Sequence, residues 1–231
     1  MPRQGLNRRK VLEAALRVVD EEGLEELTMR RLAQVLGVEA PSLYKHIAAK
    51  NDILDGIAGL VYEEIDFGDA SGSFSDRVHS YANSCRRALL RHPNAVPIMA
   101  TRPVTGKGTM ALAETVIDQM HGLGFCTEMG RRILNVSYGF IVGHALAEVG
   151  SGHRSLAEIR ETRRSFECVI SEDVARTVAF DPVDHDAEFE LGIDLIIAGI
   201  EQRAASLRAE RLVSSGQLGP ASAAQSPLGQ P

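Results

Sequence analysis

Residues 28–46, TMRRLAQVLGVEAPSLYKH, decide the fold, because they have the pattern of two short helices joined by a tight turn. Thr28 is a typical N-cap for the first helix, and Gly37 can adopt the left-handed conformation that ends it. Pro41 suits the first position of the next helix because its φ angle is already helical. The pattern predicts a helix-turn-helix whose second helix runs from Pro41 to His46.

The second of these helices can read DNA. Leu43 and Ile47 are four residues apart and can face a core, which leaves the polar side chains between them toward solvent. Recognition in the major groove needs such a short exposed helix, held in place by a neighbouring one. Three packed helices with a solvated face would also give this pattern without any DNA. The candidate contacts are Thr28, Arg30, Ala40, Pro41, Ser42, Tyr44, Lys45, His46 and Lys50.

The charge distribution favours contact with DNA at the N-terminal end. The chain has a net charge of -6. Residues 1–50 hold nine basic and seven acidic side chains, whereas the remainder holds 16 basic and 24 acidic ones. A basic module on an acidic body is expected when only one end meets phosphates. The segment with Arg3, Arg8, Arg9 and Lys10 can follow the neighbouring DNA backbone or minor groove.

The rest of the chain also reads as helices, which predicts an all-α protein. Apolar residues in 8–23 recur with helical spacing, and Asn51 is the expected cap of a fourth helix. Turn-forming residues in FGDASGSFSD, 67–76, indicate a boundary. Further helices are predicted at 75–91, 106–121, 127–149 and 186–213, with a short one at 171–179. The predicted units are a DNA-binding domain at 1–66, a larger effector-binding and dimerisation domain at 67–213, and a disordered tail at 214–231.

Composition excludes several classes of protein. The residues are 44 % hydrophobic and 24 % charged, as in a soluble globular protein. No apolar run of about 18 residues and no N-terminal signal segment is evident, so we expect a cytoplasmic protein without a membrane partner. Cys85, Cys126 and Cys168 form no CxxC pair and are expected to be buried thiols. Because no motif such as GxSxG or HExxH occurs, we expect no catalytic residue, no metal site, no cofactor and no enzyme.

The stretch LTMRRLAQVLGVEAPSLYKHIAAKNDILD, 27–55, resembles the tetracycline-repressor (TetR) family of bacterial regulators, and the likeness covers about residues 8–66. The resemblance implies a helix-turn-helix domain followed by a helical ligand-binding body. Ala40 and Lys45 stand where the tetracycline repressor has Gln and Trp, so a different operator is expected. By resemblance, the residues that contact DNA are Met29, Arg30, Ala40, Pro41, Ser42, Tyr44, Lys45, His46 and Lys50.

A DNA-binding head of this kind covers only half of a two-fold site, so the chain is expected to dimerise. Residues 127–149 are apolar around most of the predicted helix, and FELGIDLIIAGIE, 189–201, has a second wide apolar face. Both helices could instead fill the core of a monomer. The resemblance implies a four-helix dimer interface, with Ile133, Gly139, Gly143, Leu146, Phe189, Ile193, Ile196, Ile197 and Ile200 as its candidate residues.

The body also resembles the C-terminal domain of the tetracycline repressor, through RRALLRH, 86–92, and ATRPV, 100–104. That repressor binds its drug as a magnesium chelate through a histidine and a glutamate. Ile98 and Ala147 stand at those places and have no lone pair to offer, so the expected effector is a small molecule without magnesium. The candidate effector pocket, which could also be ordinary core, is Tyr81, Cys85, Ile98, Thr101, Arg102, Leu112, Val116, Ser137 and Phe140.

His144 and Glu148 lie four residues apart on one predicted helix face. Two ligands are too few for a metal site, so we interpret them as a surface or interface pair. The sequence as a whole predicts a regulator that binds a palindromic operator as a homodimer and blocks transcription until a small-molecule effector releases it. An activator, or a regulator controlled by a partner protein, would share the same fold.

Overall fold

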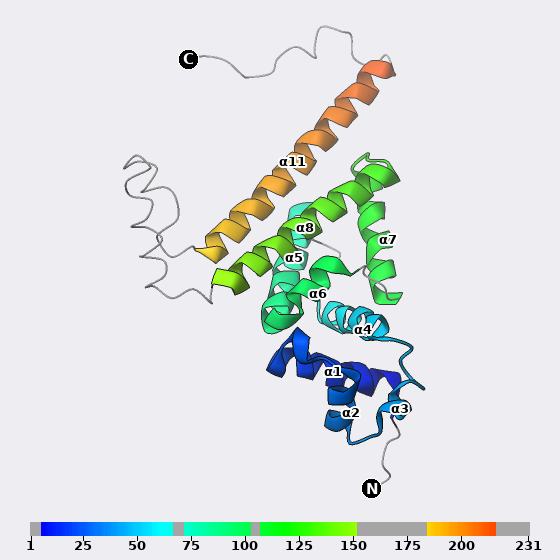
Figure 1. Ribbon diagram of the computed structural model, residues 1–231. Coiled ribbons are helices and arrows are strands. Elements are labelled where there is room, and N and C mark those ends of the chain that lie inside the picture. Colours follow the sequence, from blue (N-terminus) through cyan, green and yellow to red (C-terminus); the bar gives the residue numbers. More distant parts are fainter. Residues whose placement is uncertain (1–5, 67–71, 103–106, 152–183, 216–231) are drawn as a thin grey trace, which may run out of the picture.

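The protein is described by a computed structural model, in which every regular element of the described ranges is a helix and none is a strand. The all-α class predicted from the sequence is therefore confirmed. Figure 1 shows a small head at the N-terminal end and a larger body of longer helices. The described residues are 6–66, 72–102, 107–151 and 184–215, with backbone alone at 107–113 and 151.

The head packs its helices on one apolar core. The first helix buries Val11, Ala14 and Val18 along one face, which is the spacing seen in the sequence. The side chain of Asn7 caps this helix by accepting a hydrogen bond from the backbone N–H of Lys10 at 2.9 Å. The head consists of α1 (Arg8–Glu22), α2 (Met29–Leu36), α3 (Ala40–Leu43) and α4 (Lys50–Glu63).

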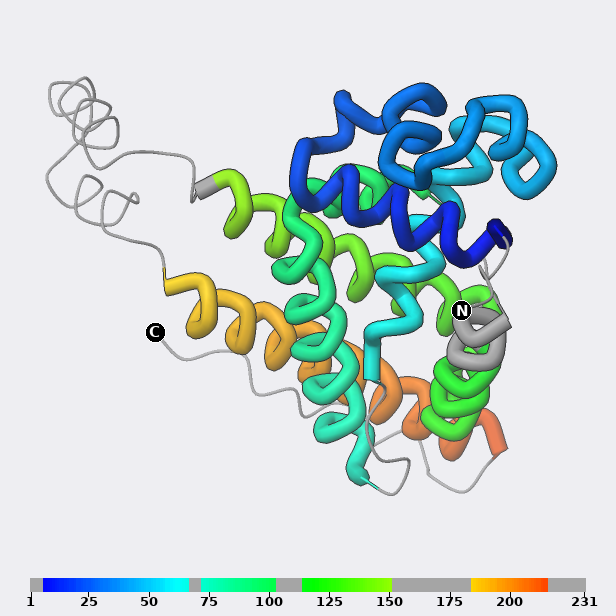
Figure 2. Tube along the Cα trace, turned by 90° about the horizontal axis from the view of Figure 1, so that it is seen from below, coloured from blue at the N-terminus to red at the C-terminus, as the bar shows by residue number. Residues whose placement is uncertain are grey.

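One long helix, α8, is central to the body and packs against α5, α6, α7 and α11. Figure 2 shows α11 lying along α8, with α5 beside both. The body consists of α5 (Phe74–Arg91), α6 (Val96–Thr101), α7 (Lys107–Gly122), α8 (Thr127–Ser151) and α11 (His185–Ser214).

The fourth helix connects the head to the body. α4 packs against α1 on one side and against α5 and α6 on the other. Just after α4, the backbone N–H of Asp66 donates to Oγ of Ser84 on α5 at 2.8 Å. α4 is therefore in direct contact with both the head and the body.

Two predicted boundaries in the head are wrong. The second helix of the helix-turn-helix is α3, Ala40–Leu43, and residues 44–46 continue it only as a turn. Asn51 does not cap α4, because the N-cap is Ala49, which makes no side-chain cap bond. The carboxylate of Asp52 instead accepts a hydrogen bond from the backbone N–H of Ala48 at 3.1 Å.

In the body, α6 is a helix that the sequence analysis missed. The predicted body helices otherwise begin and end within two residues of the observed ones. The helix expected at 171–179 lies outside the described residues, as does most of the tail predicted at 214–231. The first two residues of that tail are described and are ordered instead, because Ser214 ends α11 and Ser215 is its C-cap.

The expectation that no segment is long and apolar enough to cross a membrane needs correction. Residues Thr127–Gly150 of α8 meet that test by length and mean hydropathy alone. One such helix is weak evidence for a span: 17 % of that window is buried in the single chain, and α8 packs against four other helices.

Candidate DNA-binding head and effector-binding body

The first helix of the helix-turn-helix is fixed at both ends by local interactions. Oγ1 of Thr28 accepts a hydrogen bond from the backbone N–H of Arg31 at 3.1 Å, which makes Thr28 the N-cap of α2 as predicted. Gly37 has φ 64° and ψ 34°, the left-handed conformation that ends the helix. The side chain of Leu32, in the middle of α2, is fully buried in the core of the head. The turn into α3 therefore leaves α2 at a defined angle.

The alternation of buried and exposed residues on α3 and its following turn matches the sequence prediction. Leu43 and Ile47 are at most 1 % exposed, whereas Tyr44 is 57 % exposed. The two buried side chains anchor the segment to the core of the head, so that its other face points to solvent. Among the remaining candidates, Thr28, Arg30, Pro41, Lys45 and Lys50 are exposed, and Met29, Ala40, Ser42 and His46 are half-buried.

Some positive side chains of the head form ion pairs with carboxylates of the head, and others do not. Within the described residues, no carboxylate pairs with Arg30, Lys45 or Lys50. By contrast, Arg8 binds both oxygens of Asp52 at 2.6 and 2.8 Å, and its hydrogen bonds hold the pKa of that carboxyl below its usual value. Arg8 is therefore engaged within the head rather than free to follow DNA.

Arg9 is engaged in the same way, since it pairs with Glu13 at 2.8 Å and with Glu63 at 3.0 Å. The predicted basic N-terminal arm thus loses two of its charges to internal ion pairs. Arg3 lies outside the described residues.

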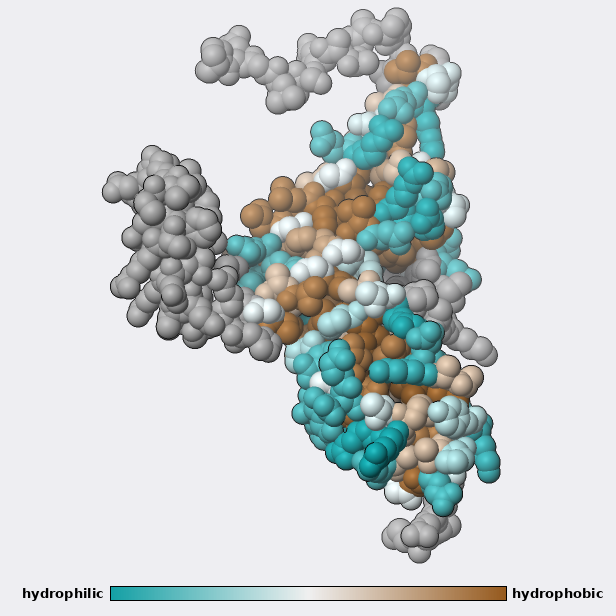
Figure 3. All heavy atoms as spheres, viewed as in Figure 1, coloured by the Kyte–Doolittle hydropathy of each residue, from teal (hydrophilic) through white to brown (hydrophobic). Residues whose placement is uncertain are grey.

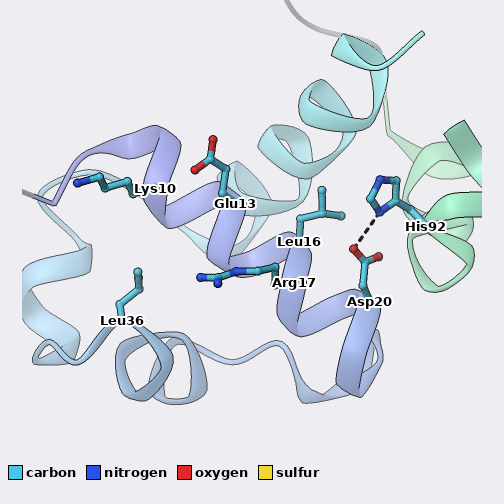
Figure 4. Close-up of a pocket in the computed structure, with 7 residues that line it drawn as sticks. All are labelled: Lys10, Glu13, Leu16, Arg17, Asp20, Leu36 and His92. Carbon is cyan, nitrogen blue, oxygen red and sulfur yellow. Dashed lines mark hydrogen bonds and ion pairs between the residues drawn. The ribbon is translucent and has the colours of Figure 1, made fainter. Parts of the chain in front are cut away.

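The head meets the body at His92, just after α5. Its Nδ1 lies 2.9 Å from Oδ2 of Asp20 on α1, and its Nε2 lies 3.0 Å from Oε1 of Glu64. Burial raises the pKa of Asp20, and the hydrogen bond to His92 partly offsets this. Figure 4 shows the pair at one end of a cleft of about 530 Å³ between α1 and α2, lined by Lys10, Glu13, Leu16, Arg17, Asp20, Leu36 and His92.

Three of the predicted effector-pocket residues, Tyr81, Cys85 and Ile98, belong to the core where α4, α5, α6 and α8 meet. Two tyrosines that the sequence analysis missed share this region. The rings of Tyr62 and Tyr138 stack at 5.9 Å, and the hydroxyl of Tyr138 donates to the backbone carbonyl of Met99 at 3.1 Å. Burial raises the pKa of Cys85 and of Tyr138, each to about 12, so both groups are neutral near pH 7.

Two other pocket candidates lie at the end of α6, and one of them contacts the head. Arg102 donates to Oδ1 of Asn51 at 3.1 Å and pairs with Asp55 at 3.4 Å, both on α4. Thr101 is exposed, and its hydroxyl donates to the carbonyl of Pro97 at 2.8 Å. Arg102 therefore connects the end of α6 to α4, whereas Thr101 bonds within α6.

The remaining candidates lie toward α11. Phe140 stacks on Phe189, with ring centroids 5.8 Å apart. Val116 packs in a second apolar cluster near the N-terminal end of α8. Ser137 lines a groove between α8 and α11. The side chain of Leu112 lies outside the described residues. The structure therefore brings together only part of the predicted pocket.

An apolar face extends along α8 and α11, and Figure 3 shows hydrophobic side chains gathered there. Val136 is 66 % exposed and Leu195 is 65 % exposed. A Cβ added to Gly139, Gly143 or Gly199 would meet no atom within 4 Å. The groove in this face has a volume of about 310 Å³ and is lined by Phe125, Met129, Arg132, Ile133, Val136, Ser137, Leu195, Ile196, Gly199, Ile200 and Arg203.

The predicted interface residues separate into two groups. Ile133, Ile196 and Ile200 line the groove, and Gly139, Gly143 and Leu146 are exposed on the same helix pair. Phe189, Ile193, Ile197 and Ile200 are at most 7 % exposed, because they pack inside the chain. Their role at an interface stays a prediction, whereas Val136, Leu191 and Leu195 are exposed apolar residues of the same helix pair.

The cysteine prediction holds for one residue of the two that are described. Cys85 is buried, but Cys126 is exposed at the start of α8. Cys168 lies outside the described residues.

Known proteins resemble this chain in both parts. Residues 11–57 match the family model of bacterial regulatory proteins, tetR family, and residues 68–204 match that of the tetracyclin repressor-like C-terminal domain. An HTH-type transcriptional regulator of Saccharopolyspora erythraea is 30 % identical over an alignment of 203 residues, which covers 84 % of each chain. The class D tetracycline repressor of Escherichia coli is 33 % identical over an alignment of 147 residues, which covers 62 % of this chain and 66 % of the repressor.

A solved structure gives the same result. The Streptomyces coelicolor TetR family protein ActR, in complex with actinorhodin, has a TM-score of 0.78 and 25 % identity over 87 % of this chain and 99 % of ActR. The family matches cover both the helix-turn-helix and most of the body. The chain therefore belongs to the TetR family of bacterial DNA-binding transcriptional regulators, with a ligand-binding helical body, and is not an enzyme.

Proposed function

We propose that the protein is a cytoplasmic repressor that binds a palindromic operator as a homodimer and releases it when a small effector binds the body. The observation that carries this proposal is the uncovered apolar face of α8 and α11, on a chain with one DNA-binding head. A helix-turn-helix dimer places its two reading helices about 34 Å apart, one turn of DNA. The proposed units are the DNA-binding domain at 1–66 and the effector-binding and dimerisation domain at 67–213.

In the proposed complex, the exposed side of α3 and its turn enters the major groove. Tyr44 and Lys45 have the greatest freedom to reach base edges, because neither is held by the core. Arg30 and Lys50 are exposed cations without an internal carboxylate partner, and they suit phosphate contacts. Ser42 and His46 are half-buried, so they can contact DNA only if the segment lies deep in the major groove.

The proposed effector binds without magnesium, near the core formed by Tyr62, Tyr81, Cys85 and Tyr138. Ile98 is 2 % exposed and offers no ligand atom. ActR in complex with actinorhodin has a similar fold, and the stacked rings of Tyr62 and Tyr138 in an apolar core support an aromatic, partly apolar class of effector. Because α4 packs against both α6 and α1, it is the proposed lever. A coupling of about 1–3 kcal/mol would weaken operator binding about 5–150-fold.

The test uses the purified full-length protein on an operator obtained by binding-site selection. Aromatic compounds, including actinorhodin, are titrated against the complex with and without a magnesium chelator, beside tetracycline with magnesium. We expect release that persists in the chelator. Release that requires magnesium would refute the metal-free effector, and transcription that falls on release would make the protein an activator.

A further inference from the structure

Two histidines and a glutamate from different helices meet at one end of the body. His144 lies on α8, whereas His185 and Glu188 lie on the first turn of α11. One ligand atom of each, a ring nitrogen or a carboxylate oxygen, lies within 4.8 Å of the other two. The sequence paired His144 with Glu148, but folding brings His144 to a different set of partners.

Glu148 is engaged elsewhere. Arg86 donates from Nε and from Nη2 to its two carboxylate oxygens, each at 2.9 Å. Oε2 of Glu148 lies 3.9 Å from Nδ1 of His144, too far for a hydrogen bond. Arg86 also pairs with Asp186 at 2.7 Å. Glu148 therefore pairs with Arg86 and does not hydrogen-bond to His144.

The surroundings of His144 are unusual for a histidine that serves only packing. Its side chain is 10 % exposed, and neither ring nitrogen has a hydrogen-bond partner among the described residues. The ring packs against Phe189 at 5.3 Å and meets the ring of His185 edge-on at 5.6 Å. Because buried polar atoms are almost always paired, two unused ring nitrogens at this place need an explanation.

The charges beside the cluster also suit a cation. The carboxylates of Glu148, Asp186 and Glu188 outnumber the single guanidinium of Arg86. These four described groups therefore carry a net negative charge.

We infer that His144, His185 and Glu188 form a binding site for a divalent transition-metal ion, with Zn²⁺ as the best match. Two imidazole nitrogens and one carboxylate oxygen are a ligand set that zinc accepts, with a fourth position for water. Magnesium prefers oxygen ligands and does not fit this set. Zinc bonds of about 2.0–2.2 Å require the three ligand atoms to approach further, and the exposed Glu188 side chain is able to move inward.

Such an ion would tie the first turn of α11 to α8. These two helices also form the proposed dimer face, so the site would stabilise the geometry on which dimerisation depends. The inference itself does not require the proposed repressor function, because it concerns binding of the ion by the single chain.

The test is equilibrium binding of Zn²⁺ to the full-length protein after chelator treatment, in competition with a chromophoric chelator. We expect one high-affinity ion per chain. Co²⁺ in its place should give a visible ligand-field spectrum of tetrahedral type. His144→Ala and Glu188→Ala should each weaken Zn²⁺ binding by more than about tenfold, the lower end of what loss of an outer-shell partner alone costs.

Two matched controls come from the same protein. His121→Ala removes an exposed histidine elsewhere, and Glu201→Ala removes an exposed glutamate from α11; both should bind Zn²⁺ as the unaltered chain does. Zn²⁺ should raise the thermal midpoint of the controls but not of Glu188→Ala, whose exposed site tolerates substitution without loss of fold. Equal Zn²⁺ affinity in all four variants, or no zinc binding by the unaltered chain, would overturn the inference.

Discussion

Leu195→Ala is the sharpest perturbation of the proposed dimer face. Burying a complete leucine side chain contributes about 2 kcal/mol, and Leu195 is 65 % exposed in the single chain. Covering that part is worth roughly 1.3 kcal/mol, of which alanine would retain a minority, so the loss is about 1 kcal/mol per copy. A two-fold interface contains the residue twice. The dimer should therefore lose about 2 kcal/mol, a roughly 30-fold increase in the dimerisation Kd.

Sedimentation velocity over a concentration series measures this Kd. Val35→Ala is the matched control, because Val35 is an apolar residue of α2 that is 38 % exposed and distant from the groove. Its dimerisation should equal that of the unaltered chain. Unchanged dimerisation in Leu195→Ala, or an unaltered chain that is monomeric at micromolar concentration, would refute the assignment of this face.

Three further predictions concern stability, measured as the free energy of unfolding. Gly192→Ala should destabilise the chain by about 1–2 kcal/mol, because the new Cβ would overlap the ring of Phe140 and overpacking outweighs the gain in helix propensity; a more stable variant would contradict this packing. Thr28→Ala should cost about 1 kcal/mol through loss of the α2 cap, whereas no change would mean that the cap is dispensable. The lowered pKa of Asp52 means that its pairing with Arg8 stabilises the chain above pH 3.8, the ordinary pKa, and is lost as pH falls through the lowered folded value. Asp52→Asn should flatten that acid limb, and an unchanged limb would disprove the linkage.

Local signals predicted the DNA-binding head well. Thr28 and Gly37 act through neighbours in the sequence, so their roles as helix start and stop are determined by short-range geometry. The position of Ala49 as the cap of α4 could not be predicted in this way, because the carboxylate of Asp52 replaces a side-chain cap. The helix α6 was missed because Pro93 and Pro97 resemble helix breakers, although proline is tolerated in a first turn.

Tertiary arrangement was harder to predict than helix content. α11 is apolar on two sides, and periodicity does not say which side meets the body and which meets a partner. Folding buries Ile193 and Ile197 and leaves Leu191 and Leu195 exposed. Several of the dimer residues implied by the resemblance are therefore buried in the single chain, and their role at an interface stays a prediction.

The same limit applies to the candidate sites of the body. Tyr62 and Tyr138 lie far apart in the sequence, and only the packing of α4 on the body brings their rings together. His144 and His185 are likewise remote until α11 lies along α8. No local motif marks either arrangement.

Binding-site selection with the purified full-length protein tests the central claim, that α3 and its turn read a two-fold DNA site, most directly. The unaltered chain should enrich one palindromic motif with half-sites about one helical turn apart. The double variant Tyr44→Ala/Lys45→Ala, whose side chains are exposed and outside the core, should fold normally and enrich no such motif. Enrichment of the same motif by this variant with equal affinity, or of no motif by the unaltered chain, would contradict the account.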